Sequence, residues 1–196
     1  MPKKSVDSQQ SWQSLKPGTL HAVEQLRNQL EVAQDSPQDL IDTYLIAKRA
    51  LAESMQALLR ESLPDSCPTF HDLREQLAGA LSERFGGKIP EQYLRVPYSS
   101  RTHEELFTIL LKSQGSPVPA MMLRIISADS VHTERRMREL RELGLDIVAG
   151  KTQGVDVYTL HSLEIDPEPL SSIPKNLIRQ DKNLTKAEKE DLISRL

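Results

Sequence analysis

The segment from Val131 to Leu160 constrains the fold more than any other part of this 196-residue chain. Its first half, VHTERRMRELREL, predicts a short basic helix from about Thr133 to Leu143, and Gly144 stands where glycine commonly closes a helix. Apolar residues then predict two strands, Leu145 to Val148 and Val155 to Leu160. The residues between the strands include two glycines, which suit a hairpin loop.

Two more short helices are predicted immediately before this segment. Residues 103–112 have an apolar face at helical spacing, and residues 118–127 follow a Gly-Ser-Pro break. Three short helices followed by a hairpin are typical of a winged helix-turn-helix, which we expect over residues 101–165. In such a module the third helix lies in the major groove of duplex DNA, while the hairpin contacts the neighbouring backbone.

The N-terminal part of the chain predicts longer helices. Residues 1–17 are polar and lack helical periodicity, so we expect a disordered tail there. Broad apolar stripes then predict helices from about Gly18, from Pro37 to Leu63 and from Thr69 to Phe85. Residues 18–100 should therefore form a helical bundle and a linker. Bundles with wide apolar stripes often pair with a copy of themselves, so we expect a homodimer through these helices.

Two segments are predicted to contain linkers. Residues 86–100 contain two glycines and two prolines and predict a linker, with a short extended piece at about Tyr93 to Val96. Residues 166–196 begin with a second linker, rich in Pro and Ser, and end with LTKAEKEDLISRL, which predicts a helix capped by Thr185. The expected fold class is mainly α, an N-terminal helical bundle plus a C-terminal winged helix-turn-helix with a short β-hairpin.

Composition excludes several classes of protein. The formal net charge of −3 argues against a nonspecific cationic sheath for nucleic acid, so any DNA contact must come from arginines gathered on one face. We find no apolar run that could span a bilayer and no signal peptide, so we expect a cytoplasmic protein without a membrane partner. The single cysteine, Cys67, can form neither an internal disulfide nor a zinc cage.

The predicted basic helix has a core face and an outer face. Met137, Leu140 and Leu143 cluster on the core side of a helical wheel, and Arg135 and Arg138 lie opposite. A guanidinium group matches guanine and phosphate with two hydrogen bonds, so these arginines predict contacts to bases or phosphates. The same composition also fits a solvated face on which Glu and Arg pair at i, i+3 and i, i+4 spacing.

The candidate DNA-contacting residues come from this helix, its start and the hairpin tip. The side chains at the helix start suit the DNA backbone or a base, and those at the tip suit phosphate, although an ordinary polar turn would have the same composition. The predicted set is His132, Thr133, Arg135, Arg136, Arg138, Lys151, Thr152 and Gln153.

No catalytic centre is predicted. The five histidines show no ligand spacing, and no carboxylate pair is followed by a lysine as in metal-dependent nucleases. The stretch GLDIVAGKT, Gly144 to Thr152, has five residues between its glycines where the nucleotide-binding loop has four. We therefore expect no cofactor and no metal ion, and leave open whether the chain belongs to an enzyme.

Residues 117–160 resemble the winged-helix modules of bacterial and phage restriction and HNH-type endonucleases. In those modules a phrase such as TERRMRELRELGLDI is followed by a short Gly-containing wing and a Tyr-x-Leu strand, here Tyr158-Thr159-Leu160. The resemblance implies the target-recognition part of a restriction-type endonuclease, which binds duplex DNA at a particular sequence or at modified bases. None of the nuclease residues of such enzymes is present in this chain.

Two other functions remain open at the level of sequence. A transcriptional regulator with the same module would bind a palindrome as a dimer formed by the N-terminal helices. A protein–protein adaptor would use the winged helix to dock a partner, in keeping with the acidic net charge.

Overall fold

The computed structural model describes most of the chain, namely residues 11–31, 36–128, 132–166 and 168–196. Over these ranges the protein is mainly helical, with eight α-helices and one three-stranded antiparallel sheet. The chain divides into two compact units, residues 1–64 with 124–130 and residues 65–123 with 131–196. None of the described helices combines the length and apolar character that crossing a bilayer requires.

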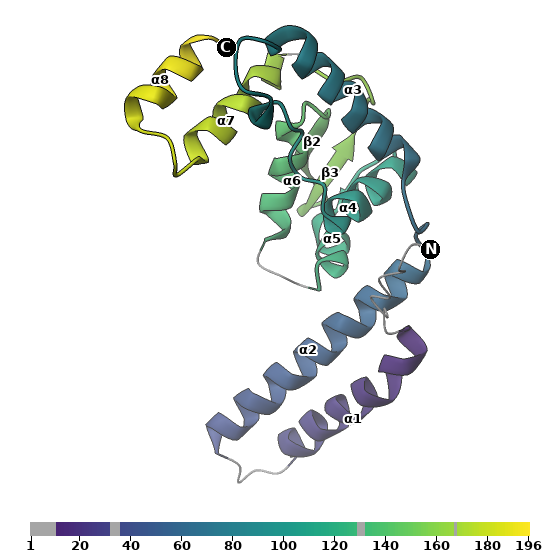
Figure 1. Cartoon of the computed structure of the whole chain (residues 1–196). Coiled ribbons are helices and arrows are strands. Elements are labelled where there is room, and N and C mark those ends of the chain that lie inside the picture. The colour runs from purple at the N-terminus through teal and green to yellow at the C-terminus, as the bar shows by residue number, and fades with distance from the viewer. Residues whose placement is uncertain (1–10, 32–35, 129–131, 167) are drawn as a thin grey trace, which may run out of the picture. The chain divides into compact units, whose positions relative to one another are not determined.

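The first unit is built on a hairpin of two long helices, α1 (Trp12–Glu31) and α2 (Pro37–Glu61), which lie side by side (Figure 1). They run antiparallel, so the start of α1 lies beside the end of α2, where the backbone N–H of Trp12 donates a 2.8 Å hydrogen bond to the carboxylate of Glu61. Ser36 caps α2 by accepting a hydrogen bond from a backbone N–H of its first turn. The buried side chains of the two helices are small, and they are Thr19, Ala22, Ala47 and Ser54.

Helix α1 begins before the start that the sequence predicts. The lack of helical periodicity in residues 1–17 predicts a start at about Gly18. Helix α1 nevertheless carries Pro17 in its interior, where proline is disfavoured. The bond between Trp12 and Glu61 ties the first turn of α1 to α2 and stabilises the helix ahead of the proline. Residues 12–17 are therefore helical, and residues 1–10 of the expected tail lie outside the described residues.

The second unit contains the third long helix, which the sequence predicts to belong to an N-terminal bundle. The helical region of the first unit is therefore a two-helix hairpin and not a three-helix bundle. The elements from this helix to the end of the chain are, in order, α3 (Pro68–Phe85), the 3-10 turn η1 (Glu91–Tyr93), α4 (Arg101–Lys112), β1 (Val118–Pro119), α5 (Ala120–Ile126), α6 (Thr133–Glu142), β2 (Ile147–Thr152), β3 (Val155–Leu160), the 3-10 turn η2 (Glu168–Ser171), α7 (Ser172–Gln180) and α8 (Lys186–Ser194).

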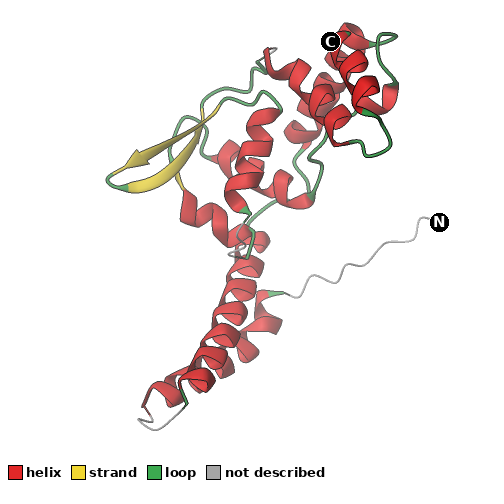
Figure 2. Ribbon diagram, turned by 90° about the vertical axis from the view of Figure 1, so that its left-hand side faces the viewer, coloured by secondary structure: helices red, strands yellow, loops and turns green. Residues whose placement is uncertain are grey.

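The sheet of the second unit has the order β1–β3–β2, so the last strand of the chain lies in the middle. Val118 of β1 pairs with Tyr158, and the β2–β3 ladder runs without interruption to Thr152 and Val155. Strands β2 and β3 form a hairpin that extends beyond the neighbouring helices of its unit (Figure 2).

Two sequence predictions for this sheet are wrong in detail. The loop expected over residues 149–154 is a two-residue turn, Gln153-Gly154, because β2 continues through Gly150. Both turn residues have positive φ angles, 50° and 80°, as a type I′ hairpin turn requires. The helix expected from Val118 starts two residues later, because Val118 and Pro119 form β1. A two-residue strand is too short to produce a detectable alternation of apolar and polar residues.

Helix α6 packs on the apolar core of the second unit with the face that the sequence predicts. Met137 and Leu140 are 0% exposed and Leu143, directly after the helix, is 2% exposed, which confirms the predicted core face. Other large side chains that are fully buried in this unit come from α3, α4, α5, β3 and α7, and they include Phe70, Leu77, Leu81, Phe85, Leu106, Phe107, Leu110, Leu123, Leu160 and Ile178.

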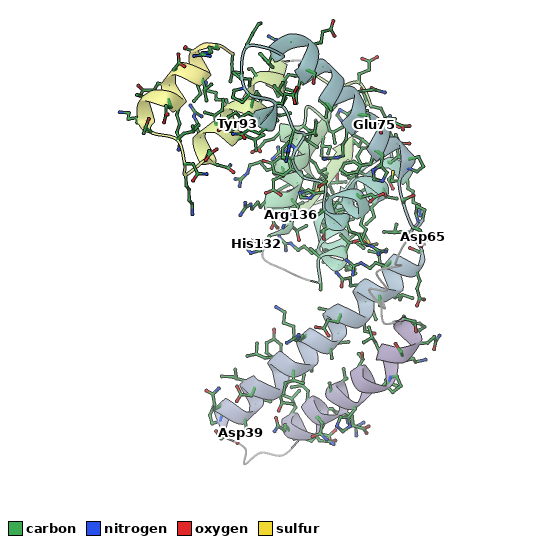
Figure 3. All side chains as sticks on the ribbon, in the orientation of Figure 1. Asp39, Asp65, Glu75, Tyr93, His132 and Arg136 are labelled. Carbon is green, nitrogen blue, oxygen red and sulfur yellow. The ribbon has the colours of Figure 1, made fainter. Side chains whose placement is uncertain are left out.

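The two expected linkers are partly ordered and packed. Tyr93, labelled in Figure 3, belongs to η1 and is buried, so the short extended piece expected there is absent. Its hydroxyl donates a 2.7 Å hydrogen bond to Asp181. The Pro- and Ser-rich segment contains η2 and the first turn of α7, and α7 buries Ile173 and Ile178. Its proline, Pro174, lies in the first turn, where proline is tolerated. Helix α8 begins as predicted, with a capping box between Thr185 and Glu188.

Candidate nucleic-acid interface

The candidate interface consists of the outer face of α6 and the β2–β3 hairpin. Gly144 joins these two elements, with φ +84°, and its N–H bonds to the carbonyl of Arg141. A Cβ atom at Gly144 would lie 2.8 Å from the carbonyl oxygen of Asp166, and the N–H of Asp166 donates a 3.1 Å hydrogen bond to the carbonyl of Gly144. Only glycine fits this junction, so this glycine sets how α6 leads into β2.

A buried glutamate organises two of the predicted arginines. Glu139 is 4% exposed and accepts three hydrogen bonds, from Arg135 Nε at 2.9 Å, from Arg136 Nη1 at 3.0 Å and from His103 Nε2 at 2.8 Å. Arg136 projects from α6 in Figure 3. Because the carboxylate is buried, it holds one edge of each guanidinium group against the body of the unit.

His103 completes this cluster from α4 and is 1% exposed. Its second ring nitrogen, Nδ1, lies 2.6 Å from the hydroxyl of Ser100, within hydrogen-bond distance. Burial lowers the pKa of His103, and Arg136 lowers it further, while the hydrogen bond to Glu139 opposes the shift. The imidazole is therefore neutral near pH 7, with Nε2 donating to Glu139 and Nδ1 accepting from Ser100.

The carboxylate of Glu139 stays ionised in this environment. Burial alone would raise its pKa, but the hydrogen bonds from His103, Arg135 and Arg136 outweigh burial and lower it below the ordinary value. A buried carboxylate with three donors is a satisfied charge, and removing the donors would leave it uncompensated.

A second acid, Glu142, connects the end of α6 to the segment before α4. It accepts a 2.6 Å hydrogen bond from the hydroxyl of Tyr98, a residue held at φ +62°. Burial raises the pKa of Tyr98, and the bond to Glu142 raises it further, so this hydroxyl stays protonated. The other oxygen of Glu142 lies 4.0 Å from Arg138 Nε, at the limit of an ion pair.

The outer face of α6 exposes the arginines that the sequence predicts. The side chains of Arg135 and Arg138 are 63% and 64% exposed, whereas that of Arg136 is 37% exposed because it leans on Glu139. Arg141, which was not in the predicted set, is also exposed on this helix. The three predicted arginines pair with Glu139 and Glu142 at i, i+4 or i, i+3 spacing. Such pairs are what the alternative interpretation, a solvated helix face with internal ion pairs, predicts.

The remaining predicted residues fall into two groups. His132, Thr152 and Gln153 are exposed, as is Lys151, whose ammonium lies 3.7 Å from Asp156 on the facing strand. Thr133 is 2% exposed, so its side chain is not available at the surface, and we remove it from the candidate set. It lies four residues before Met137 and seven before Leu140, so helical spacing places it on the core face.

Two further results bear on the chemistry of this site. Within the described ranges, no three His, Cys, Asp or Glu side chains come close enough together to share a metal ion. No protein-family model matches the chain, and neither a curated protein nor a solved structure is similar to it.

Proposed function

We propose that the second unit is a winged helix that binds duplex DNA, with α6 in the major groove and the β2–β3 hairpin on the adjacent backbone. The observation that carries this proposal is the order of elements from α4 to β3, which is helix, strand, helix, helix, strand, strand, with β3 between β1 and β2. This order places an arginine-bearing helix immediately before a projecting hairpin, as a helix-turn-helix with a wing requires.

The contacts around α6 also support a role for its arginines. Arg135 is bonded to Glu139 through Nε, and its side chain is still largely exposed. A guanidinium group held on one edge loses less conformational entropy on binding than one that is free. Arg138 lies at the centre of the outer face, and its contact with Glu142 is long. The proposed contacts on the helix are therefore Arg138 and Arg135, with Arg136 and His132 at the margin.

The hairpin would supply the backbone contacts. Lys151 is 72% exposed and lies close to the tip formed by Gln153 and Gly154. Its ammonium, together with the exposed Thr152 and Gln153, suits phosphate oxygens. The chain carries a net charge of −3, so the interaction would depend on this local arrangement and not on the overall field.

The restriction-type setting belongs to the same proposal and rests on the resemblance of residues 117–160 alone. In that setting the unit would recognise a target, either a sequence or modified bases, in the cytoplasm. A dimeric transcriptional regulator with the same unit is the alternative for the biological role, and both roles require duplex binding.

Binding of the full chain to duplexes, measured by fluorescence anisotropy at two salt concentrations, tests the proposal. Plain duplexes and duplexes with methylated or otherwise modified bases form the panel. We expect Arg138→Ala to weaken binding by about 1–3 kcal/mol, roughly 5- to 150-fold in Kd. Arg138→Lys should retain most of the affinity if the contact is to phosphate and should lose it if the contact is bidentate to guanine.

Arg49→Ala is the matched control for this experiment. Arg49 is an exposed arginine of α2 that pairs with Glu53 at i, i+4 spacing and 2.8 Å, so its removal deletes the same charge and the same kind of ion pair away from α6. Equal affinity and equal salt dependence for Arg138→Ala and the wild type would exclude α6 from a DNA interface.

A protein-docking function is the second candidate, because each of the three predicted arginines on α6 has a glutamate partner. Such pairing is the normal state of a solvated helix that binds no anion. Absence of binding to every duplex at low salt would favour this function over DNA binding.

A further inference from the structure

The hairpin of α1 and α2 exposes an unusual number of large apolar side chains. Four side chains are buried in these two helices, and none of them is larger than threonine. A pair of helices needs an apolar layer between it and another element to be stable, and small side chains supply little of it. The large apolar residues of the pair are instead partly exposed.

Helix α2 presents two rows of residues at alternating spacings of three and four. The row turned to α1 is made of small or half-buried residues, namely Leu40, Thr43, Ala47, Ala50, Ser54 and Ala57. The second row lies about a quarter turn away and carries larger side chains, namely Ile41, Tyr44, Lys48, Leu51, Met55 and Leu58. Its five apolar members are between 37% and 50% exposed. Apolar residues at alternating spacings of three and four are the pattern with which one helix packs lengthwise against another.

The second row and part of α1 share one side of the hairpin. The opposite side is marked by an open groove of mixed lining, in which the polar side chains of His21, Gln25 and Glu53 alternate with smaller and apolar ones. At 3.6 residues per turn, Met55 lies half a turn from Ile46, which also lines the groove, and Val23 and Leu30 lie nearly half a turn from His21. We define the apolar face of the hairpin as Val23 and Leu30 of α1 with Ile41, Tyr44, Leu51, Met55 and Leu58 of α2.

We infer that the apolar face binds the same face of a second copy of this chain, so that the two hairpins form a four-helix bundle around a two-fold axis. The row on α2 is symmetric about its midpoint. In an antiparallel pair of α2 helices, Ile41 stands opposite Leu58 and Tyr44 opposite Met55. A two-fold interface needs such self-complementarity, since each patch meets its own copy.

Lys48 is the one charged member of the row, and it stands opposite Leu51 of the second copy. A lysine at a single core position lowers stability but selects one register, because its stem packs on apolar surface while its ammonium reaches the edge. The antiparallel register places each ammonium beside a leucine and not directly opposite the other lysine. In this register, a charge introduced at position 51 would face Lys48 of the second copy.

The size of the face is sufficient for a dimer. From Ile41 to Leu58 the row is about 26 Å long at 1.5 Å per residue, and two helices side by side are about 20 Å wide. Even flat contact would cover roughly 500 Å² on each copy, or about 1,000 Å² in total, which is the lower bound for a specific interface. Interdigitated side chains bury more than a flat contact does. The inference is independent of DNA binding, because it concerns the first unit alone.

Sedimentation equilibrium of the full chain without DNA, at about 1–100 µM, tests the inference. We expect a mass of twice 22.1 kDa for the wild type. Leu51→Lys should raise the dissociation constant at least about 100-fold, because each dimer loses two buried leucines and gains like charges beside Lys48. Leu51→Glu should weaken the dimer less than Leu51→Lys does, because a carboxylate opposite Lys48 is attracted to it.

Ile46→Lys is the matched control, since Ile46 is 64% exposed and lines the groove on the opposite side of the hairpin. It should leave the dimer intact, and far-UV circular dichroism should show wild-type helix content for all three variants. A monomeric wild type throughout the concentration range would overturn the inference. A dimer that Ile46→Lys disrupts and Leu51→Lys does not would place the interface on the other side and overturn it equally.

Discussion

Glu139 is the residue on which the local geometry of α6 depends. It lies on a helix whose sequence alternates glutamates with arginines, so nothing local distinguishes it from Glu134 or Glu142. The structure buries it because His103, 36 residues earlier in the chain, donates to it from α4. Removing Glu139 would release Arg135 and Arg136 and leave a buried imidazole without its acceptor.

The titration of His103 gives this cluster a pH signature. The pKa of His103 is lowered by burial, so between its folded value and its ordinary value of about 6.5 the unfolded chain binds a proton that the folded chain does not. The free energy of unfolding should therefore fall as the pH drops below about 6.5. The lowered pKa of Glu139 acts in the same direction at more acidic pH, because its stabilising contribution is lost on protonation.

Urea unfolding at pH 7.5 and pH 5.5 measures this effect. We expect the wild type to lose stability between the two values and His103→Gln to lose less, although it is less stable at pH 7.5. His21→Gln, at an exposed histidine of α1, is the control and should keep the wild-type dependence. If His103→Gln and the wild type lose the same free energy, His103 is not the group responsible.

At the scale of elements, two glycines with left-handed backbone differ in what surrounds them. At Gly154 in the hairpin turn, an added Cβ atom would meet no other atom within 4 Å, so Gly154→Ala should lower the free energy of unfolding by roughly 1–2 kcal/mol, the cost of the φ angle. Gly144→Ala adds a contact of 2.8 Å with the carbonyl oxygen of Asp166. It should cost a further ~1–3 kcal/mol, because the backbone must shift. Urea titration of both variants gives the difference, and equal costs would show that the junction is not tightly packed.

Much of the helical structure could be predicted from the sequence, because it depends on local periodicity and caps. The apolar stripe of α6, the capping box of α8 and the proline at the start of α2 each identify an element within a few residues. Strand β1 and helix α7 could not be predicted in this way. The first is too short to have a period, and the second carries Pro174 in its first turn and follows a Pro- and Ser-rich stretch that usually indicates a loop.

In the candidate site, too, the local features could be predicted from the sequence and the tertiary contacts could not. The exposure of Arg135 and Arg138 follows from helical spacing. The burial of Thr133 follows from it too, although Thr133 belongs to the predicted DNA-contacting set. The partners of the arginines depend on tertiary contacts. His103 and Tyr98 reach α6 from positions more than 30 residues away, a distance at which a single sequence carries no pairing signal.

At the scale of the whole molecule, the chain carries two surfaces with separate proposed roles. The apolar face of the hairpin would join two copies, and each copy would bring one DNA-binding unit. If both proposals hold, two copies related by a two-fold axis should bind a site with matching symmetry.

Footprinting on a selected duplex tests this combination. We expect two symmetric half-sites for the wild type. Leu51→Lys should bind more weakly and lose the symmetric pattern, because the DNA-binding units of the two copies are then no longer linked. A footprint of the wild type that covers a single asymmetric site would contradict the combination, even if each unit acts as proposed by itself.

The bond between Tyr93 and Asp181 has a practical consequence for anyone who trims this protein. Helix α7 inserts Ile173 and Ile178 into the interior of the second unit. A fragment that ends just after the β2–β3 hairpin would therefore have apolar cavities where these side chains belong. The shortest piece that keeps a complete interior therefore has to retain η1 and α7 together with α6, although neither η1 nor α7 contributes a residue to the proposed DNA contact.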